Sequence, residues 1–213
     1  MKALLKICTI VLCISTGAQA AITGLALGTG APPATLGSYA MTPFPLDPQG
    51  SPVTSVASPL GGSVGFSQSL NHATVGGGWA TWSHGYTGDV YHDPAASGSL
   101  SLTLTLPAAT GAFYFYAEPN PFSVHTITAT AQDGTQVAQS PSGSSGATGY
   151  GFYGTGGSLI TSIAVTCPTA DFAVGEFGIA RGTGGPVVPA PAAALLGSLG
   201  VGLVGYLRRR RSL

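Results

Sequence analysis

The side chains best suited to binding or chemistry gather in one short segment, residues 76–93 of the 213-residue chain. It contains both tryptophans of the protein, together with tyrosines, histidines and aspartates. Flat amphipathic rings beside carboxylates can stack on sugar faces and accept hydrogen bonds from sugar hydroxyls. This segment is therefore a candidate carbohydrate site, built from Trp79, Trp82, Tyr86, Asp89 and Tyr91, with Tyr114 and Tyr116 as further candidate rings.

The spacing of the two tryptophans limits this interpretation. Trp79 and Trp82 are three residues apart and would face opposite sides of a regular strand. Tryptophan side chains are largely buried in most proteins. We therefore expect one tryptophan to pack in the core, and binding stays open for the other.

Metal ligands are present in the segment, but not at the spacing of a known motif. Its two histidines are eight residues apart, which fits no zinc motif. Asp89 and Asp93 could join Glu118 or Asn120 in a calcium site, although no EF-hand pattern is present. Solvated turn residues are the simpler interpretation of these aspartates. The sequence thus predicts no metal site and no cofactor, with calcium as the open alternative.

Catalysis by paired carboxylates is the next possibility. Glu118 and Glu176 are the only glutamates, and each follows an aromatic stretch. Glycoside hydrolysis needs two carboxyl groups about 5–10 Å apart in a cleft, which sequence cannot place. The chain has no nucleophile elbow. We therefore predict no catalytic residues and a protein that is not an enzyme, with an envelope glycan hydrolase as the weakest alternative.

The sequence around this segment predicts short strands separated by Gly- and Pro-rich turns. Strict alternation over residues 99–106 predicts a half-buried strand with Leu100, Leu102, Leu104 and Leu106 on one face. Asp133-Gly134 predicts a hairpin turn. Further strands are expected at 35–41, 53–56, 61–67, 110–117, 122–130, 150–154, 159–166 and 171–180. Residues 21–181 are thus predicted to form an all-β antiparallel two-sheet sandwich of the jelly-roll type, with a closed barrel as the alternative.

The first 20 residues have the pattern of a secretory signal peptide. Two lysines precede a short apolar run, which ends in Ala18-Gln19-Ala20. Small residues at the first and third positions of this triplet are typical of a signal cleavage site, so the mature chain is predicted to begin at Ala21.

The C-terminal end has three parts in a fixed order. A Gly-rich linker at 182–186 leads into a tail, 187–213, that opens with a Pro-rich break. Residues 192–207 carry no charge and predict a single transmembrane helix that is slightly short for an upright span. The arginines that follow would lie at the cytoplasmic face and leave the rest of the chain outside: Arg208, Arg209, Arg210 and Arg211.

The net charge of the exported part differs from that of the whole chain. Of seven basic residues, two lie within 1–20 and four within 208–211, so Arg181 alone faces seven acidic residues. Residues 21–181 therefore carry a formal charge of −6. This charge argues against nucleic acid or anionic lipid as a partner of the domain.

The tail resembles the PEP-CTERM sorting signal of Gram-negative bacteria. The motif residues are Val188, Pro189, Ala190 and Pro191, and the family's usual Glu is replaced by Ala190. Segments of the domain also resemble a β-rich domain of such proteins: 78–91, 112–121, 152–157 and 171–179.

This resemblance implies a partner and a location. The partner is an exosortase, a transpeptidase-like membrane enzyme that cuts the tail. The precursor would be anchored in the inner membrane, transiently or permanently, and the mature protein would lie at the cell surface or in the extracellular matrix. Such proteins accompany exopolysaccharide, so we expect a non-enzymatic surface or biofilm-matrix protein, with extracellular polysaccharide as a further partner. A calcium-assisted carbohydrate-binding module is the alternative.

Overall fold

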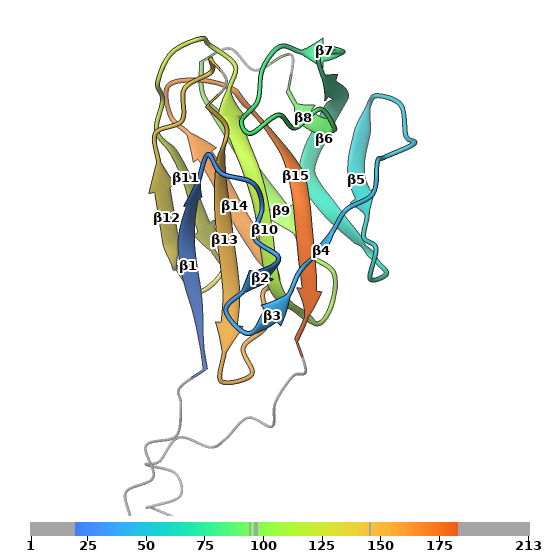
Figure 1. The fold of residues 1–213 in the computed structure, drawn as a ribbon, viewed down its shortest axis with the longest axis vertical. Coiled ribbons are helices and arrows are strands. Elements are labelled where there is room, and N and C mark those ends of the chain that lie inside the picture. Colours follow the sequence, from blue (N-terminus) through green and yellow to red (C-terminus); the bar gives the residue numbers. More distant parts are fainter. Residues whose placement is uncertain (1–19, 94, 96–97, 145, 183–213) are drawn as a thin grey trace, which may run out of the picture. The chain divides into compact units, whose positions relative to one another are not determined.

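In the computed structural model, the described residues are 20–93, 95, 98–144 and 146–182. Strands are the only regular elements in this part of the chain (Figure 1). They are β1 Ala21–Gly28, β2 Thr35–Leu36, β3 Tyr39–Ala40, β4 Thr42–Pro43, β5 Val53–Ala57, β6 Ser63–Val75, β7 Gly78–Trp79, β8 Asp89–His92, β9 Leu100–Thr105, β10 Thr110–Pro119, β11 Ile127–Ala131, β12 Gln136–Gln139, β13 Thr148–Thr155, β14 Ser162–Cys167 and β15 Phe172–Arg181.

The strands pair along one continuous path, β1-β13-β10-β15-β8-β6-β9-β14-β11-β12. Every pairing on this path is antiparallel. Off the path, β4 pairs with β15 and β5 with β6, while the small β7 lies parallel to β6. The prediction of an all-β antiparallel fold is confirmed.

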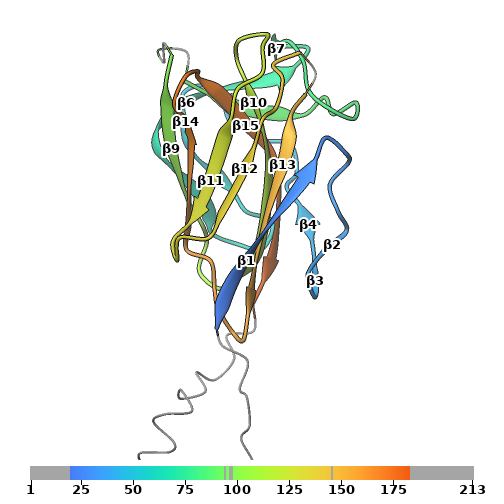
Figure 2. The same ribbon diagram turned by 90° about the vertical axis from the view of Figure 1, so that its left-hand side faces the viewer.

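Strand β6 is 13 residues long and joins two layers of the sheet. Its second half, Asn71–Thr74, pairs with β8, whereas Gly65 and Phe66 in its first half pair with β9. One layer holds β1, β13, β10, β15 and β8, and the other holds β9, β14, β11 and β12 (Figures 1 and 2). The far ends also meet, since the Ile22 amide donates to Asp133 Oδ2 over 3.2 Å. The sheet is therefore nearly closed, like a barrel.

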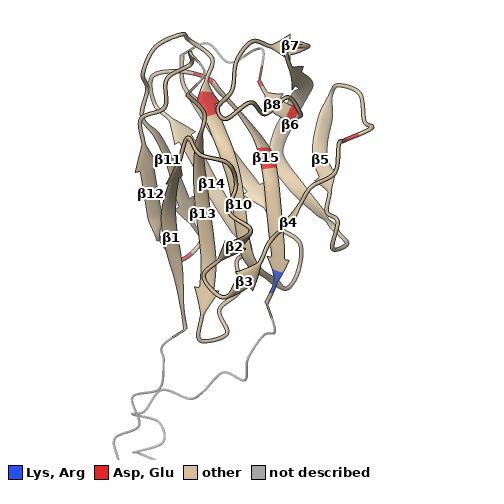
Figure 3. Cartoon of the chain, viewed as in Figure 1, with Lys and Arg blue, Asp and Glu red and all other residues tan. Residues whose placement is uncertain are grey.

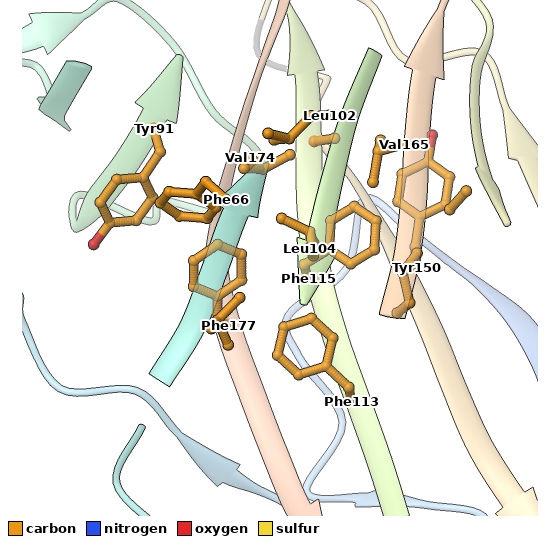
Figure 4. Packing of buried hydrophobic residues seen from close by; sticks show 14 of the residues in the cluster. Phe66, Tyr91, Leu102, Leu104, Phe113, Phe115, Tyr150, Val165, Val174 and Phe177 are labelled. Carbon is orange, nitrogen blue, oxygen red and sulfur yellow. The ribbon is translucent and has the colours of Figure 1, made fainter. Parts of the chain in front are cut away.

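The main core lies between the two layers. Leu100, Leu102, Leu104 and Leu106 are all buried there, which confirms the alternation read from residues 99–106. Aromatic rings fill the centre: Phe115 stacks on Tyr150 at 5.2 Å between ring centroids, and Phe177 stacks on Tyr91 at 5.7 Å (Figure 4). The Asp133-Gly134 turn joins β11 to β12, as predicted.

The outer face of the first layer is covered as well. All ten residues of β10 are buried, because chain segments pack on both sides of it. Leu36 covers Ala112 and Ala180 near one end, and the tryptophans cover Tyr114 and Tyr116 at the other. The rings at 114 and 116 are thus buried, with 2% and 0% of their surface exposed.

The structure differs from the expected strands in three places. The single strand expected at 35–41 is instead the short hairpin of β2 and β3, because the chain turns at Gly37 with φ of +58°. The strand predicted at 122–130 begins only at Ile127, since Phe122 and Val124 are exposed and Val124 forms no more than an isolated bridge with Ser142. Conversely, β1 was not expected in the Gly-rich start of the domain, yet it pairs with β13 over most of its length. Long-range pairing outweighs the weak strand preference of its glycines.

The predictions for both ends of the chain lie outside the described residues. These are the signal peptide, the linker from residue 183 onward, and the tail with its motif, helix and arginines. Within the described ranges no helix has the length and apolar character of a membrane span.

Candidate functional site

A pocket of about 200 Å³ lies beside β15, where this strand passes from its pairing with β8 to its pairing with β4. Most of its wall comes from three segments: the end of β4 and the residues after it, the end of the 76–93 segment, and the middle of β15. Single residues before β2, in β5 and in β10 complete the wall. The wall residues are Pro32, Pro43, Phe44, Pro45, Leu46, Val56, Tyr86, Asp89, Tyr91, Tyr114, Glu176 and Phe177. Rings and prolines thus surround two carboxylates.

A β-bulge in β15 places Glu176 in this wall. Tyr114 of β10 pairs with Gly178 of β15, and Tyr116 pairs with Gly175. The two tyrosines are two residues apart and the two glycines three, so β15 contains one extra residue here. The backbone of Glu176 takes up the extra residue with φ of +53°, a left-handed conformation that is rare for residues other than glycine. The bulge keeps Glu176 on the outer face while Phe177 turns into the main core.

Both carboxylate oxygens of Glu176 are engaged by side chains of the 76–93 segment. Trp82 Nε1 donates to Oε2 over 3.0 Å, and His84 Nε2 lies 2.7 Å from Oε1. His84 also has a left-handed backbone, with φ of +41°. Burial raises the pKa of Glu176, and the bonds from His84 and Trp82 offset only part of this shift. Two strained residues in contact are typical of a site that the surrounding structure holds in place.

Asp89 is held in the same way on the other side of the pocket. His72 Nε2 lies 2.9 Å from Oδ1, and the Asp47 amide donates to Oδ2 over 2.6 Å. The other ring nitrogen of His72 lies 2.6 Å from the Gln49 carbonyl oxygen. Burial lowers the pKa of His72, but the bonds to Asp89 and Gln49 and nearby negative charge raise it overall. Asp89 is thus fixed as an acceptor.

Three tyrosines complete the polar part of the pocket. The Tyr86 hydroxyl donates to the Asp89 carbonyl oxygen over 3.1 Å, and the Tyr91 hydroxyl donates to Asp47 Oδ2 over 3.0 Å. Burial and, secondarily, Glu176 raise the pKa of Tyr114 to about 12. Burial also raises the pKa values of Tyr86 and Tyr91. All three hydroxyls therefore keep their protons at physiological pH, and those of Tyr86 and Tyr91 are donated to protein groups.

The predicted site residues divide into two groups. Tyr86, Asp89 and Tyr91 come together in the pocket wall. Trp82 lies behind them, with its ring centroid 6.0 Å from that of Tyr86. Trp79 does not reach the pocket and instead lines a separate shallow hollow.

The two tryptophans do not face opposite sides, because β7 ends at Trp79 and the chain is irregular as far as β8. Both pack in one cluster with Tyr114 and Tyr116 and are only 7% and 5% exposed. Neither presents an open ring face, so their role is to hold the carboxylates by their indole N–H groups.

Glu118 does not pair with Glu176, as the hydrolase alternative would need. It lies fully buried away from the pocket, where Trp79 Nε1 donates to Oε2 over 3.0 Å. The Thr81 hydroxyl and the Gly146 amide each donate to Oε1 over 3.1 Å. Asp89, rather than Glu118, shares a pocket with Glu176.

The oxygen ligands considered for calcium are also separated. Asp93 accepts bonds from Gln68 Nε2 and the Ala95 amide, and Asn120 Nδ2 donates to Asp171. Among the described residues, no three His, Cys, Asp or Glu side chains gather as metal ligands would.

The chain matches no protein-family model, no curated protein and no solved structure. Function is therefore inferred from the geometry of the pocket.

The sequence predicted neither that Tyr114 and Glu176 share one pocket nor that residues 43–46 form part of its wall. One signal for the bulge is present in the sequence. Apolar residues occupy even positions at Phe172 and Val174 and then odd positions at Phe177 and Ile179, and all four lie in the main core. A change of phase within one strand indicates an inserted residue, here beside Glu176.

Proposed function

We propose that this protein is a non-enzymatic, exported surface or extracellular-matrix protein that is sorted by an exosortase and associates with exopolysaccharide. The observation that carries the proposal is the pocket in which Tyr86, Tyr91 and Tyr114 surround Asp89 and Glu176. Rings with a few fixed polar groups are the usual composition of a small-ligand site. The signal-peptide and tail patterns at the two ends support export.

The hydrogen bonds of the carboxylates favour binding over catalysis. Each oxygen of Asp89 and Glu176 already has a structural partner, so neither group is arranged to exchange a proton with a substrate. A carboxylate oxygen can still accept a second hydrogen bond. Held in this way, the two groups suit the recognition of sugar hydroxyls.

The second layer supports an association with hydrated polysaccharide. Its neighbouring strands β11, β14 and β9 place Thr128, Thr166 and Ser101 side by side on the outer face. These three strands carry no charged residue. We assign the domain to the two-sheet sandwich class of the jelly-roll type, because two layers enclose one core, β6 is the strand common to both, and the far ends meet without forming a strand pair.

Retention on polysaccharide tests the proposal. In a host that makes exopolysaccharide, replacing Tyr86 with alanine should reduce the amount of exported protein that co-purifies with the polysaccharide by about tenfold, through lost stacking in the pocket. Calcium chelation should leave retention unchanged, since no three His, Cys, Asp or Glu side chains of the described residues gather as ligands of a metal ion.

The matched control is Phe122→Ala, which removes an aromatic ring that is 68% exposed and does not line the pocket. It should be retained like the parent protein. Equal retention of the Tyr86→Ala variant would contradict the proposal, as would glycan cleavage that Glu176→Gln abolishes.

A further inference from the structure

We infer that the pocket takes the ammonium group of an amino sugar, so that the glycan recognised carries units with a free amine. This inference rests on the proposed glycan-binding function and names the chemical class of the ligand. It is carried by three features of the pocket: its charge, one of its rings and its apolar rim.

The charge of the pocket is negative and has no fixed counter-charge. Asp89 and Glu176 both line it, and no lysine or arginine does. Arg181 is the sole Lys or Arg in the described part of the chain; it lies at the end of β15 and donates to the Leu60 carbonyl oxygen (Figure 3). The groups beside the carboxylates are the imidazoles of His72 and His84, which carry charge only when protonated.

The burial of Glu176 points in the same direction. Its side chain is only 10% exposed, and this burial raises the pKa of the carboxyl group in spite of the bonds from His84 and Trp82. A cation in the pocket would stabilise the charged form of this group. A neutral sugar would not, and a uronic acid would add a repelling charge.

One ring is placed to bind the same group. Tyr86 lines the pocket together with both acidic residues, and its hydroxyl donates to the Asp89 carbonyl oxygen. Tyr114 is only 2% exposed, whereas Tyr86 is half-buried, so Tyr86 is the ring that a ligand can reach. An ammonium group over this ring gains cation–π attraction in addition to the charge of the carboxylates.

The rim explains why a sugar, rather than a small free amine, fits best. Pro43, Pro45 and Leu46 form an apolar edge, and Leu46 keeps 74% of its surface exposed. The pocket, at about 200 Å³, is smaller than the roughly 300–1,000 Å³ of sites for drug-sized ligands. It therefore suits one sugar unit whose carbon face rests on the rim.

Calorimetric titration of the full chain, purified in mild detergent, tests the inference. The probes are a glucosamine trimer, an N-acetylglucosamine trimer and a galacturonic acid trimer. We expect the glucosamine trimer to bind at least about tenfold more tightly than the acetylated one, and the uronic acid to bind least. Glu176→Gln and Asp89→Asn should each weaken glucosamine binding about fivefold or more.

Asp133→Asn is the control for charge, because it removes the same unit of charge at the exposed β11–β12 turn, away from the pocket. It should leave affinity unchanged within about twofold. The comparison of the three probes on the unaltered protein holds even where a pocket variant fails to fold.

Each other outcome has a definite meaning. Equal or tighter binding of the acetylated or acidic trimer overturns the ammonium assignment and leaves the proposed glycan function standing. Equal binding of a lysine amide overturns the assignment to a sugar. Binding of no glycan overturns both proposals.

Discussion

Replacing Glu118 with alanine should lower the free energy of unfolding by about 3–5 kcal/mol. The carboxylate is fully buried and accepts hydrogen bonds from the Trp79 indole, the Thr81 hydroxyl and the Gly146 amide. Alanine would leave these donors without their acceptor and would open a cavity beneath Trp79. Because Glu118 joins the 76–93 segment to the loop before β13, both would loosen. Urea denaturation followed by tryptophan fluorescence measures the change.

Glu118→Gln is the informative companion variant. It keeps the size and one acceptor oxygen, so it should lose less stability than Glu118→Ala. A loss below about 1 kcal/mol for the alanine variant would show that the buried carboxylate does not hold the segment in place.

The second large effect is expected at Phe115. Its ring is fully buried between the layers, stacked on Tyr150 at 5.2 Å and 6.3 Å from the ring of Phe113 (Figure 4). Phe115→Ala removes these contacts and leaves a cavity that the two sheets cannot close, at a cost of about 3–5 kcal/mol. Thermal denaturation by circular dichroism would report it as a lower midpoint.

Phe122→Ala provides a matched comparison, because it deletes the same side chain at a site that is 68% exposed. Its effect should stay within about 0.5 kcal/mol. Similar losses at both positions would mean that the core is not centred between the layers as described.

The parts of the fold that sequence could predict depend on local patterns. Alternation at residues 99–106 gave a face of leucines, and Asp133-Gly134 marked a hairpin, since both signals lie within a few residues. The burial of the outer face of β10 could not be predicted in this way, because the residues that cover it are distant in the sequence. Tyr114 and Tyr116 alternate with phenylalanines and look half-exposed, yet distant segments bury them.

In the candidate site, too, only the residues that are close in sequence could be grouped in advance. Tyr86, Asp89 and Tyr91 could be grouped because they are close in sequence. Glu176 and the rim residues join them only through pairings that sequence does not fix, namely β4 with β15 and β15 with β8. The two tryptophans were expected on opposite sides because a regular strand was assumed where the chain is irregular.

The most direct test of the account is the intact mass and location of the full chain, expressed in one host with an exosortase and in one without. An exported surface protein sorted by its tail should begin at Ala21, end near Pro189–Pro191, and be released only in the first host. The same mass in both hosts, with Arg208–Arg211 retained, would contradict sorting and make this a permanently anchored envelope protein.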